Sequence, residues 1–272
     1  GLIQISEDEG KTWRKVGNFP TVPDRTYVNM VLASQHDKNV VYAVFNNHKN
    51  GDFKPYVLKS NDKGRNWTNI TGDMPERGSS YAIAEDHEKK DLLFVGTEFS
   101  CFFTNNGGDN WNKLGSGLPT VAVRDIAIQE RENDLVLGTF GRGFFVLDDY
   151  SPLRTMTVEN LDQDAVIFDI KDGLQYIERK PLGIRGNGFQ GDNYWSAPNP
   201  PVGVVFTYHV KDGSTSMTKK RQKSEADAIE NGRDIRYPNY DEYKAEKEEK
   251  ESFLQFTVRD TKGNIVRQLK TG

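Results

Sequence analysis

Apolar and polar residues alternate in short runs along the first 150 residues, and turns rich in Gly, Asn, Asp and Pro separate these runs. Such alternation predicts β-strands that each bury one face. The runs come in sets of four, and each set predicts an antiparallel meander. The expected strands lie at residues 2–5, 28–33, 40–45, 56–59, 67–70, 80–84, 92–96, 99–104, 111–114, 121–128, 134–139 and 143–147.

Residues 28–70 and 80–114 each hold a complete set of four strands, residues 121–147 hold three, and the chain opens partway through a set. Four short strands per repeated unit are typical of β-propeller blades, and about four to eight blades close a ring. We therefore expect an all-β fold, the C-terminal arc of a larger propeller whose further blades lie N-terminal in the same polypeptide. The first strands then expose an apolar face.

One eight-residue turn recurs three times, before the last strand of a set. It has a hydroxyl residue, Asp or Asn two residues later, Gly two after that, and a terminal Trp. The tryptophans are 54 and 44 residues apart, a period of about 40–50 residues that indicates a solenoid or a propeller. The copies place these four residues at Ser6, Asp8, Gly10 and Trp13, at Ser60, Asp62, Gly64 and Trp67, and, as a variant, at Thr104, Asn106, Gly108 and Trp111.

The chemistry of this turn predicts a structural role. Asp62 can accept hydrogen bonds from backbone N–H groups that follow it, which closes the turn. Gly64 permits a backbone conformation that other residues avoid, and Trp67 offers an apolar face to a neighbouring sheet. The alternative interpretation is an array of carboxylates that binds a metal ion or a sugar.

The repeated turn resembles the Asp-box (BNR) repeat of sialidases, sortilin-type Vps10 domains and secreted bacterial propellers. Residues 141–149, the following Pro152-Leu153-Arg154 and residues 51–56 resemble the last blades of large secreted bacterial proteins labelled sortilin-like or glycosyl hydrolase. That family commonly has His where this chain has Phe140. The resemblance implies a propeller followed by an immunoglobulin-like domain, a bacterial source, and a secreted, periplasmic or cell-surface location.

The rest of the chain differs in composition from the first 150 residues. We expect propeller blades at residues 1–150 and an irregular linker at 151–201, with one short strand near 165–168. A partial immunoglobulin-like domain is expected at 202–272, with a strand at 202–210 and a hairpin at 253–260 and 264–269. Its charged insertion at 211–251 predicts a helix capped by Ser224 and a second helix from Tyr240; we expect a solvated excursion, the alternative being a docking element.

Composition excludes several classes of protein. A net charge of −4 argues against a nucleic-acid surface, and no run of about 18 apolar residues predicts a membrane-spanning helix. The single cysteine, Cys101, excludes an internal disulfide and lies in an alternating strand, where we expect a small buried side chain rather than a nucleophile. No phosphate loop, Ser-His-Asp signature or His cluster is visible, so neither a cofactor nor a metal ion is expected.

Candidate site residues lie on the face opposite the Asp-boxes, where the turns between second and third strands meet the connections between sets. Glu98 and Arg142 are the first choices because their turns are short. Glu98 could act as an acid or base or could pair with Arg142, and Arg142 could contact a carboxylate. Asp52 and His48 lie in a longer turn of the same kind. The plainer interpretation is a structural salt bridge or solvated charges.

Three functions remain open from the sequence. The leading hypothesis is a propeller that binds a macromolecular ligand, a protein, a peptide or a glycan, because no complete catalytic set is visible. The alternative is a glycoside hydrolase, sialidase-like or of another BNR type, whose carboxylates would flank the scissile bond. A periplasmic assembly factor is the third possibility. Sialidase chemistry requires three arginines, a Tyr/Glu pair and an acidic Asp, which this chain does not show as a set.

Overall fold

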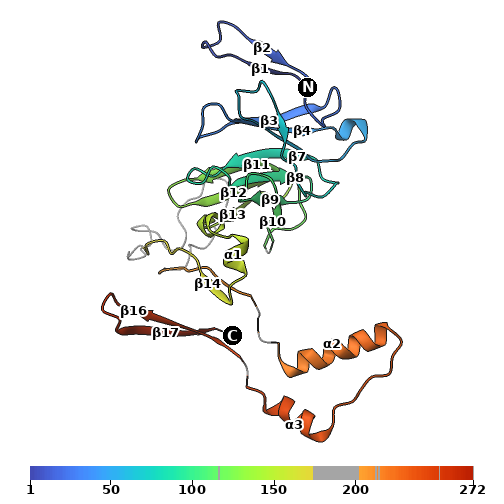
Figure 1. Cartoon of the computed structure of the whole chain (residues 1–272), viewed down its shortest axis with the longest axis vertical. Coiled ribbons are helices and arrows are strands. Elements are labelled where there is room, and N and C mark those ends of the chain that lie inside the picture. Colours follow the sequence, from blue (N-terminus) through green and yellow to red (C-terminus); the bar gives the residue numbers. More distant parts are fainter. Residues whose placement is uncertain (116, 174–201, 212, 214, 251, 272) are drawn as a thin grey trace, which may run out of the picture. The chain divides into compact units, whose positions relative to one another are not determined.

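The computed structural model describes residues 1–115, 117–173, 202–211, 213, 215–250 and 252–271. The chain divides into two compact units, Gly1–His209 and Val210–Gly272. Antiparallel sheets dominate the first unit, and the fold is all-β in class (Figure 1). Among the described residues no helix is long and apolar enough to cross a membrane.

The first unit contains a series of antiparallel sheets whose strands follow one another in chain order. The expected sets of four strands are confirmed at both complete positions, and the expected partial sets form a two-stranded and a three-stranded sheet. The first sheet is β1 (Ile3–Ile5) and β2 (Arg14–Val16); the second is β3 (Tyr27–Ala33), β4 (Val41–Asn46), β5 (Tyr56–Ser60) and β6 (Thr68–Asn69); the third is β7 (Ser80–Glu85), β8 (Leu93–Thr97), β9 (Cys101–Thr104) and β10 (Asn112–Lys113); the fourth is β11 (Val123–Gln129), β12 (Asp134–Thr139) and β13 (Phe144–Leu147).

Three hydrophobic clusters join each sheet to the next, because successive side chains of a strand point to opposite faces. In β4, Ala43 and Phe45 belong to the cluster shared with Ile3 of β1. Tyr42 and Val44 of the same strand belong to the cluster shared with β7 and β8. The two middle strands of each complete sheet, β4 and β5 in one and β8 and β9 in the other, are therefore buried on both faces.

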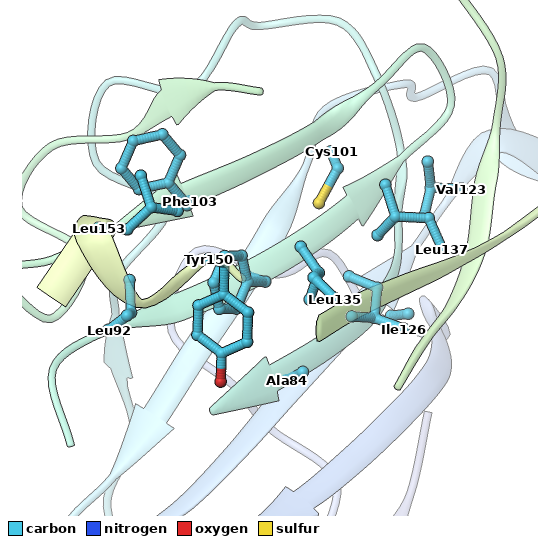
Figure 2. Packing of buried hydrophobic residues seen from close by; sticks show 12 residues of the cluster. Ala84, Leu92, Cys101, Phe103, Val123, Ile126, Leu135, Leu137, Tyr150 and Leu153 are labelled. Carbon is cyan, nitrogen blue, oxygen red and sulfur yellow. The ribbon is translucent and has the colours of Figure 1, made fainter. Parts of the chain in front are cut away.

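The third cluster packs β8 and β9 against β11 and β12, and Figure 2 shows its side chains. Leu135 and Leu137 of β12 face Cys101 and Phe103 of β9 across this core. Cys101 is fully buried, as expected, and burial raises the pKa of its thiol. A buried thiol held neutral in an apolar core is an inert packing residue.

The chain beyond β13 continues to contribute to this core. Tyr150 precedes η2 (Ser151–Arg154), and its ring packs edge-on against Phe94 with centroids 5.1 Å apart. Arg154 donates from Nε and Nη2 to the buried Asp86 at 2.9 and 2.8 Å, and the Tyr150 hydroxyl donates to Asp86 at 2.5 Å. Burial alone would raise the pKa of Asp86, but these hydrogen bonds outweigh it and hold the pKa below its ordinary value.

The region expected to be a linker contains regular structure as well. After η2 come α1 (Val158–Leu161) and β14 (Ala165–Ile167), the expected short strand, which pairs with β15 (Tyr208–Val210). The strand expected over 202–210 is therefore limited to its last three residues. The Gly-rich and Pro-rich part of the expected linker, residues 174–201, lies outside the described residues.

The second unit holds α2 (Met217–Glu230), α3 (Tyr240–Glu248) and the expected hairpin, β16 (Leu254–Arg259) with β17 (Ile265–Thr271). This hairpin is the unit's one sheet among the residues described, and the immunoglobulin-like domain stays a prediction. Arg221 of α2 donates to Glu246 of α3 at 2.9 Å, which links the two helices.

The prediction that Ser224 caps the first helix was wrong. The N-cap is Ser216, whose side chain accepts a hydrogen bond from the Lys219 amide, and Ser224 lies in the middle of the helix. Lys, Arg and Gln are good helix formers, so the basic run after Ser216 extends the helix toward the N-terminus. Asn239 and Glu242 form a capping box at the start of α3.

Candidate functional site

The three repeated turns, residues 6–13, 60–67 and 104–111, use their polar groups within the turn. Asp62 Oδ1 accepts from the amides of Arg65 and Asn66 at 2.9 and 2.8 Å, and Oδ2 accepts from the Asn66 side chain at 2.6 Å. The backbone hydrogen bond from Asn66 is the main reason that the pKa of Asp62 falls to about 2. Gly64 has a φ of +71°, the left-handed region that favours glycine. The carboxylate is therefore an internal acceptor.

The other two copies repeat this arrangement with different partners. Asp8 accepts from the amide and hydroxyl of Thr12 at 2.8 and 2.6 Å. Asn106 accepts from the Asn110 amide at 3.1 Å. An uncharged amide thus replaces the carboxylate in the third turn, which argues against an array of carboxylates that binds metal. No group of His, Cys, Asp and Glu among the described residues could hold a metal ion.

Two of the three tryptophans that end these turns, Trp67 and Trp111, pack toward the preceding sheet. Trp67 joins the cluster that contains Ile3, and Trp111 Nε1 donates to the carbonyl of Ile70 at 2.9 Å. Trp67 and Trp111 are 9% and 6% exposed, whereas Trp13 is 57% exposed. The described residues include no sheet before β1 and β2 that could cover Trp13.

The opposite ends of the sheets form what we call the distal rim: the turns β4–β5, β8–β9 and β12–β13 with the connections between sheets. Each of these three equivalent turns presents an aromatic side chain to solvent. Phe53, Phe99 and Phe140 are 44%, 43% and 72% exposed. The candidate residues Asp52, Glu98 and Arg142 lie one or two positions from these rings in sequence. The recurrence of an aromatic at each turn is the signal that the sequence analysis missed.

Backbone hydrogen bonds fix the positions of these turns. The amide of Gly78, in the connection to β7, donates to the carbonyl of Phe53 at 2.8 Å, and a Cβ placed on Gly78 would lie 3.5 Å from the Phe99 ring. The Glu98 amide donates to the carbonyl of Ser79 at 3.0 Å. The β4–β5 turn of one sheet and the β8–β9 turn of the next therefore meet at Gly78.

Two arginines lie over aromatic rings of the rim. The guanidinium carbon of Arg77 is 5.5 Å from the Phe53 ring centroid. That of Arg124, on β11, is 3.7 Å from the Tyr81 centroid and 5.4 Å from the Phe140 centroid. These contacts connect three successive sheets. We call the set the aromatic–arginine band, and its members are Phe53, Arg77, Tyr81, Phe99, Arg124 and Phe140.

Glu98 precedes Phe99 of this band and hydrogen-bonds to Tyr81. The Tyr81 hydroxyl donates to the Glu98 carboxylate. Burial, with a further contribution from this hydrogen bond, raises the pKa of Tyr81 to about 12, so the phenol stays a neutral donor at physiological pH. Glu98 and Arg142 do not form the ion pair that was considered from the sequence; within the described residues the side-chain partner of Glu98 is Tyr81.

Asp52 and His48 hold the β4–β5 turn together. Asp52 accepts from the Tyr56 hydroxyl at 2.6 Å and from Asn47 at 3.0 Å. Burial would raise the pKa of Asp52, but these hydrogen bonds lower it overall. His48 begins the short helix η1 (His48–Asn50), and its Nδ1 lies 2.5 Å from Asn46 Oδ1. Both side chains are therefore engaged within the turn.

Arg142 is placed differently from the other candidates. It is exposed at the tip of the β12–β13 turn, between Gly141 and Gly143, whose φ angles are +78° and +68°. Two successive glycines in this conformation let the turn reverse tightly. In the portion of the chain that the structure describes, no hydrogen bond or ion pair engages its guanidinium, which leaves it available to a ligand.

No family model and no curated protein matches this chain. Solved structures share a partial likeness. A GH74 xyloglucanase from Xanthomonas campestris has 16% identity and a TM-score of 0.43 over 57% of this chain, and YCF48 bound to D1 peptide has 18% identity and a TM-score of 0.41 over 55%. A GH74 enzyme from Niastella koreensis has 18% identity and a TM-score of 0.37 over 45%. The matched part covers 24% of the Xanthomonas campestris xyloglucanase, 44% of YCF48 and 21% of the Niastella koreensis enzyme, so this chain spans less than half the length of each.

Proposed function

We propose that the stacked sheets of the first unit are Asp-box blades of a β-propeller and that the distal rim binds an extended macromolecular ligand, a glycan or a peptide. The observation that carries this proposal is the exposed aromatic at each of three equivalent turns: Phe53, Phe99 and Phe140. The Asp-boxes stabilise the opposite end of each sheet. The proposal includes export of the protein, as the Asp-box resemblance implies.

Exposed phenyl rings in a row suit a polymer better than a small molecule. Each ring presents an apolar face that gains free energy when a sugar ring or an apolar side chain covers it. The rings come from the equivalent turns of three successive sheets, so they are distributed along the rim. Backbone hydrogen bonds at Gly78 and Ser79 hold the first two turns in place, which lowers the entropy lost on binding.

Hydrolysis of a glycosidic bond is the second candidate function, and one contact favours it. The Tyr81 hydroxyl donates to Glu98 beneath the guanidinium of Arg124, which brings a tyrosine, a glutamate and an arginine together. For the Tyr81 phenolate to attack a sugar, Glu98 would have to remove the proton of the Tyr81 hydroxyl, and the pKa of Tyr81 is raised to about 12. A separate acid would also have to protonate the leaving group. Binding without cleavage agrees better with a buried phenol.

A panel of immobilised oligosaccharides and peptides tests both functions. The protein is applied to the panel, and retention and product release are recorded together. We expect retention without cleavage, and loss of retention when Phe53, Phe99 and Phe140 are all replaced by alanine. Tyr237→Ala is the matched control, because Tyr237 is an exposed aromatic of the second unit. Equal retention of the triple variant would overturn the proposal, and product release that Glu98→Gln abolishes would establish the hydrolase.

A further inference from the structure

We propose that the ligand of the distal rim is an acidic polysaccharide, whose sugar rings stack on the exposed phenyl rings and whose carboxylates pair with Arg77, Arg124 and Arg142. This inference rests on the proposed function and specifies its substrate class. Of the three arginines, only Arg142 was a candidate from the sequence.

These three arginines have no carboxylate partner, unlike Arg65 and Arg154 of the same unit. Arg65 pairs with Glu7 at 2.5 Å, and Arg154 pairs with the buried Asp86 at 2.8 Å. For Arg77, Arg124 and Arg142 no such ion pair is found among the residues that the structure describes, and all three are exposed. Their guanidinium donors are therefore available to an anion.

The stacking of two of these arginines prepares them for a ligand. A guanidinium that lies over an aromatic ring uses its face, while its N–H donors remain available at the edge. Arg124 is held in this way over Tyr81 at 3.7 Å and lies 5.4 Å from Phe140. A carboxylate can then accept two parallel hydrogen bonds from a side chain that has already lost much of its rotamer freedom.

Acidic side chains share the distal rim with these arginines. The carboxylates of Asp52 and Glu98 accept hydrogen bonds from the hydroxyls of Tyr56 and Tyr81, and Asp73 accepts from the Trp111 amide at 2.6 Å. With Arg124 and the adjacent Asp125 included, the rim holds six cationic residues, Arg25, Lys49, Lys54, Arg77, Arg124 and Arg142, and six acidic ones, Asp24, Asp52, Asp73, Glu76, Glu98 and Asp125. An acidic ligand would therefore be recognised by the three arginines that have no ion pair, and not by a net positive charge of the rim.

The pairing of rings with arginines favours a polysaccharide over an acidic peptide. Phe53 lies beside Arg77, and Phe140 lies beside Arg124. A uronic acid polymer carries a ring with a flat C–H face and a carboxylate in every residue, and it can satisfy both partners of each pair. An acidic side chain of a peptide satisfies the arginine but leaves the phenyl ring uncovered.

Three immobilised polymers test the inference: polygalacturonate, its fully methyl-esterified form, and poly-L-glutamate. We expect polygalacturonate to bind most tightly, with an affinity that falls as salt rises. Arg77→Gln and Arg124→Gln should each weaken this binding by roughly tenfold. Arg131→Gln is the matched control, because Arg131 is exposed in the β11–β12 turn, at the end of the sheet away from the distal rim. Far-ultraviolet circular dichroism and melting curves verify that the variants fold.

The other outcomes would contradict either the acidic polysaccharide alone or the proposed function as well. Equal binding of the methyl ester, without salt dependence, would overturn the acidic ligand and leave the proposed polymer-binding function standing. Tighter binding of poly-L-glutamate would replace the polysaccharide by an acidic peptide. No binding of any of these polymers, together with retention of other polymers on the wider panel, would overturn this inference alone, and no retention anywhere would overturn both proposals.

Discussion

The guanidinium of Arg124 lies 3.7 Å from the centroid of the Tyr81 ring, although the two residues belong to the first strands of neighbouring sheets. The Tyr81 hydroxyl donates to Glu98 on the other side. Tyr81 thus contacts the Arg124 guanidinium through the face of its ring and the Glu98 carboxylate through its hydroxyl. These two contacts fix the positions of both charged groups at the distal rim.

Tyr81→Phe should make the free energy of unfolding less sensitive to alkaline pH. The pKa of Tyr81 is raised to about 12 in the folded state, against about 10 in the unfolded chain. Its contribution to stability is therefore fully present below pH 10 and is lost as pH rises toward 12. The free energy of unfolding, measured against pH for parent and variant, should show a smaller loss between pH 10 and 12 in the variant. Identical slopes would contradict the raised pKa.

Asp62→Ala should destabilise the first unit and lower Tm by several degrees, because it leaves the amides of Arg65 and Asn66 without their acceptor. The control is Asp109→Ala, because Asp109 is an exposed aspartate of the third repeated turn. A melting curve equal to that of the parent would refute the role of Asp62 in closing the turn.

The pH dependence of the same variant gives a second measurement. The pKa of Asp62 is lowered to about 2, so its contribution is present above the unfolded value, near 4, and is lost as pH falls toward 2. The difference in Tm between parent and variant should therefore shrink between pH 4 and 2. A constant difference over this range would argue against an ionised acceptor.

Replacing the tryptophans of the repeated turns should lower the free energy of unfolding by different amounts. Trp67→Ala removes a side chain that is 9% exposed and packs against Phe19 with ring centroids 5.6 Å apart, which should destabilise by about 3–5 kcal/mol. Trp13→Ala removes a side chain that is 57% exposed and should cost about 1 kcal/mol or less. Denaturant unfolding measures both. Equal losses would show that Trp13 is buried in solution.

The ion pair between Arg154 and Asp86 should hold η2 against the third sheet. Arg154→Ala leaves the buried Asp86 carboxylate without its bidentate partner, and breaking a buried pair in this way typically costs about 3–5 kcal/mol. In a double-mutant cycle with Asp86→Ala, the double variant should lose less stability than the two single variants lose together. Additive losses would mean that the two side chains act independently.

The strands and sheets of the first unit could be predicted because they are local. Alternation and the recurring turn locate β3 to β13, and the hydroxyl, Asp and Gly of that turn form their bonds within eight residues. The start of α2 was misplaced because the cap was expected at Ser224, whereas the helix begins one residue after Ser216, whose side chain accepts from the Lys219 amide.

The aromatic–arginine band could not be predicted in the same way. Its contacts join Phe53 to Arg77, in the connection between β6 and β7, and Tyr81 of β7 to Arg124 of β11, and the members of each pair are distant in sequence. Sequence analysis found the neighbouring Glu98 and Arg142 from the topology of the turns. It did not reveal that Glu98 would hydrogen-bond to a buried tyrosine, because that contact depends on how β7 and the β8–β9 turn meet.

Hydrogen exchange with and without a bound polymer locates the binding surface. The protein is incubated with the polymer that the panel retains most strongly, and protection is mapped on peptides that cover the turns. We expect new protection at residues 51–55, 97–100 and 139–143 and none at the repeated turns, residues 6–13, 60–67 and 104–111. Protection of the repeated turns, with the distal rim unchanged, would contradict binding at the rim.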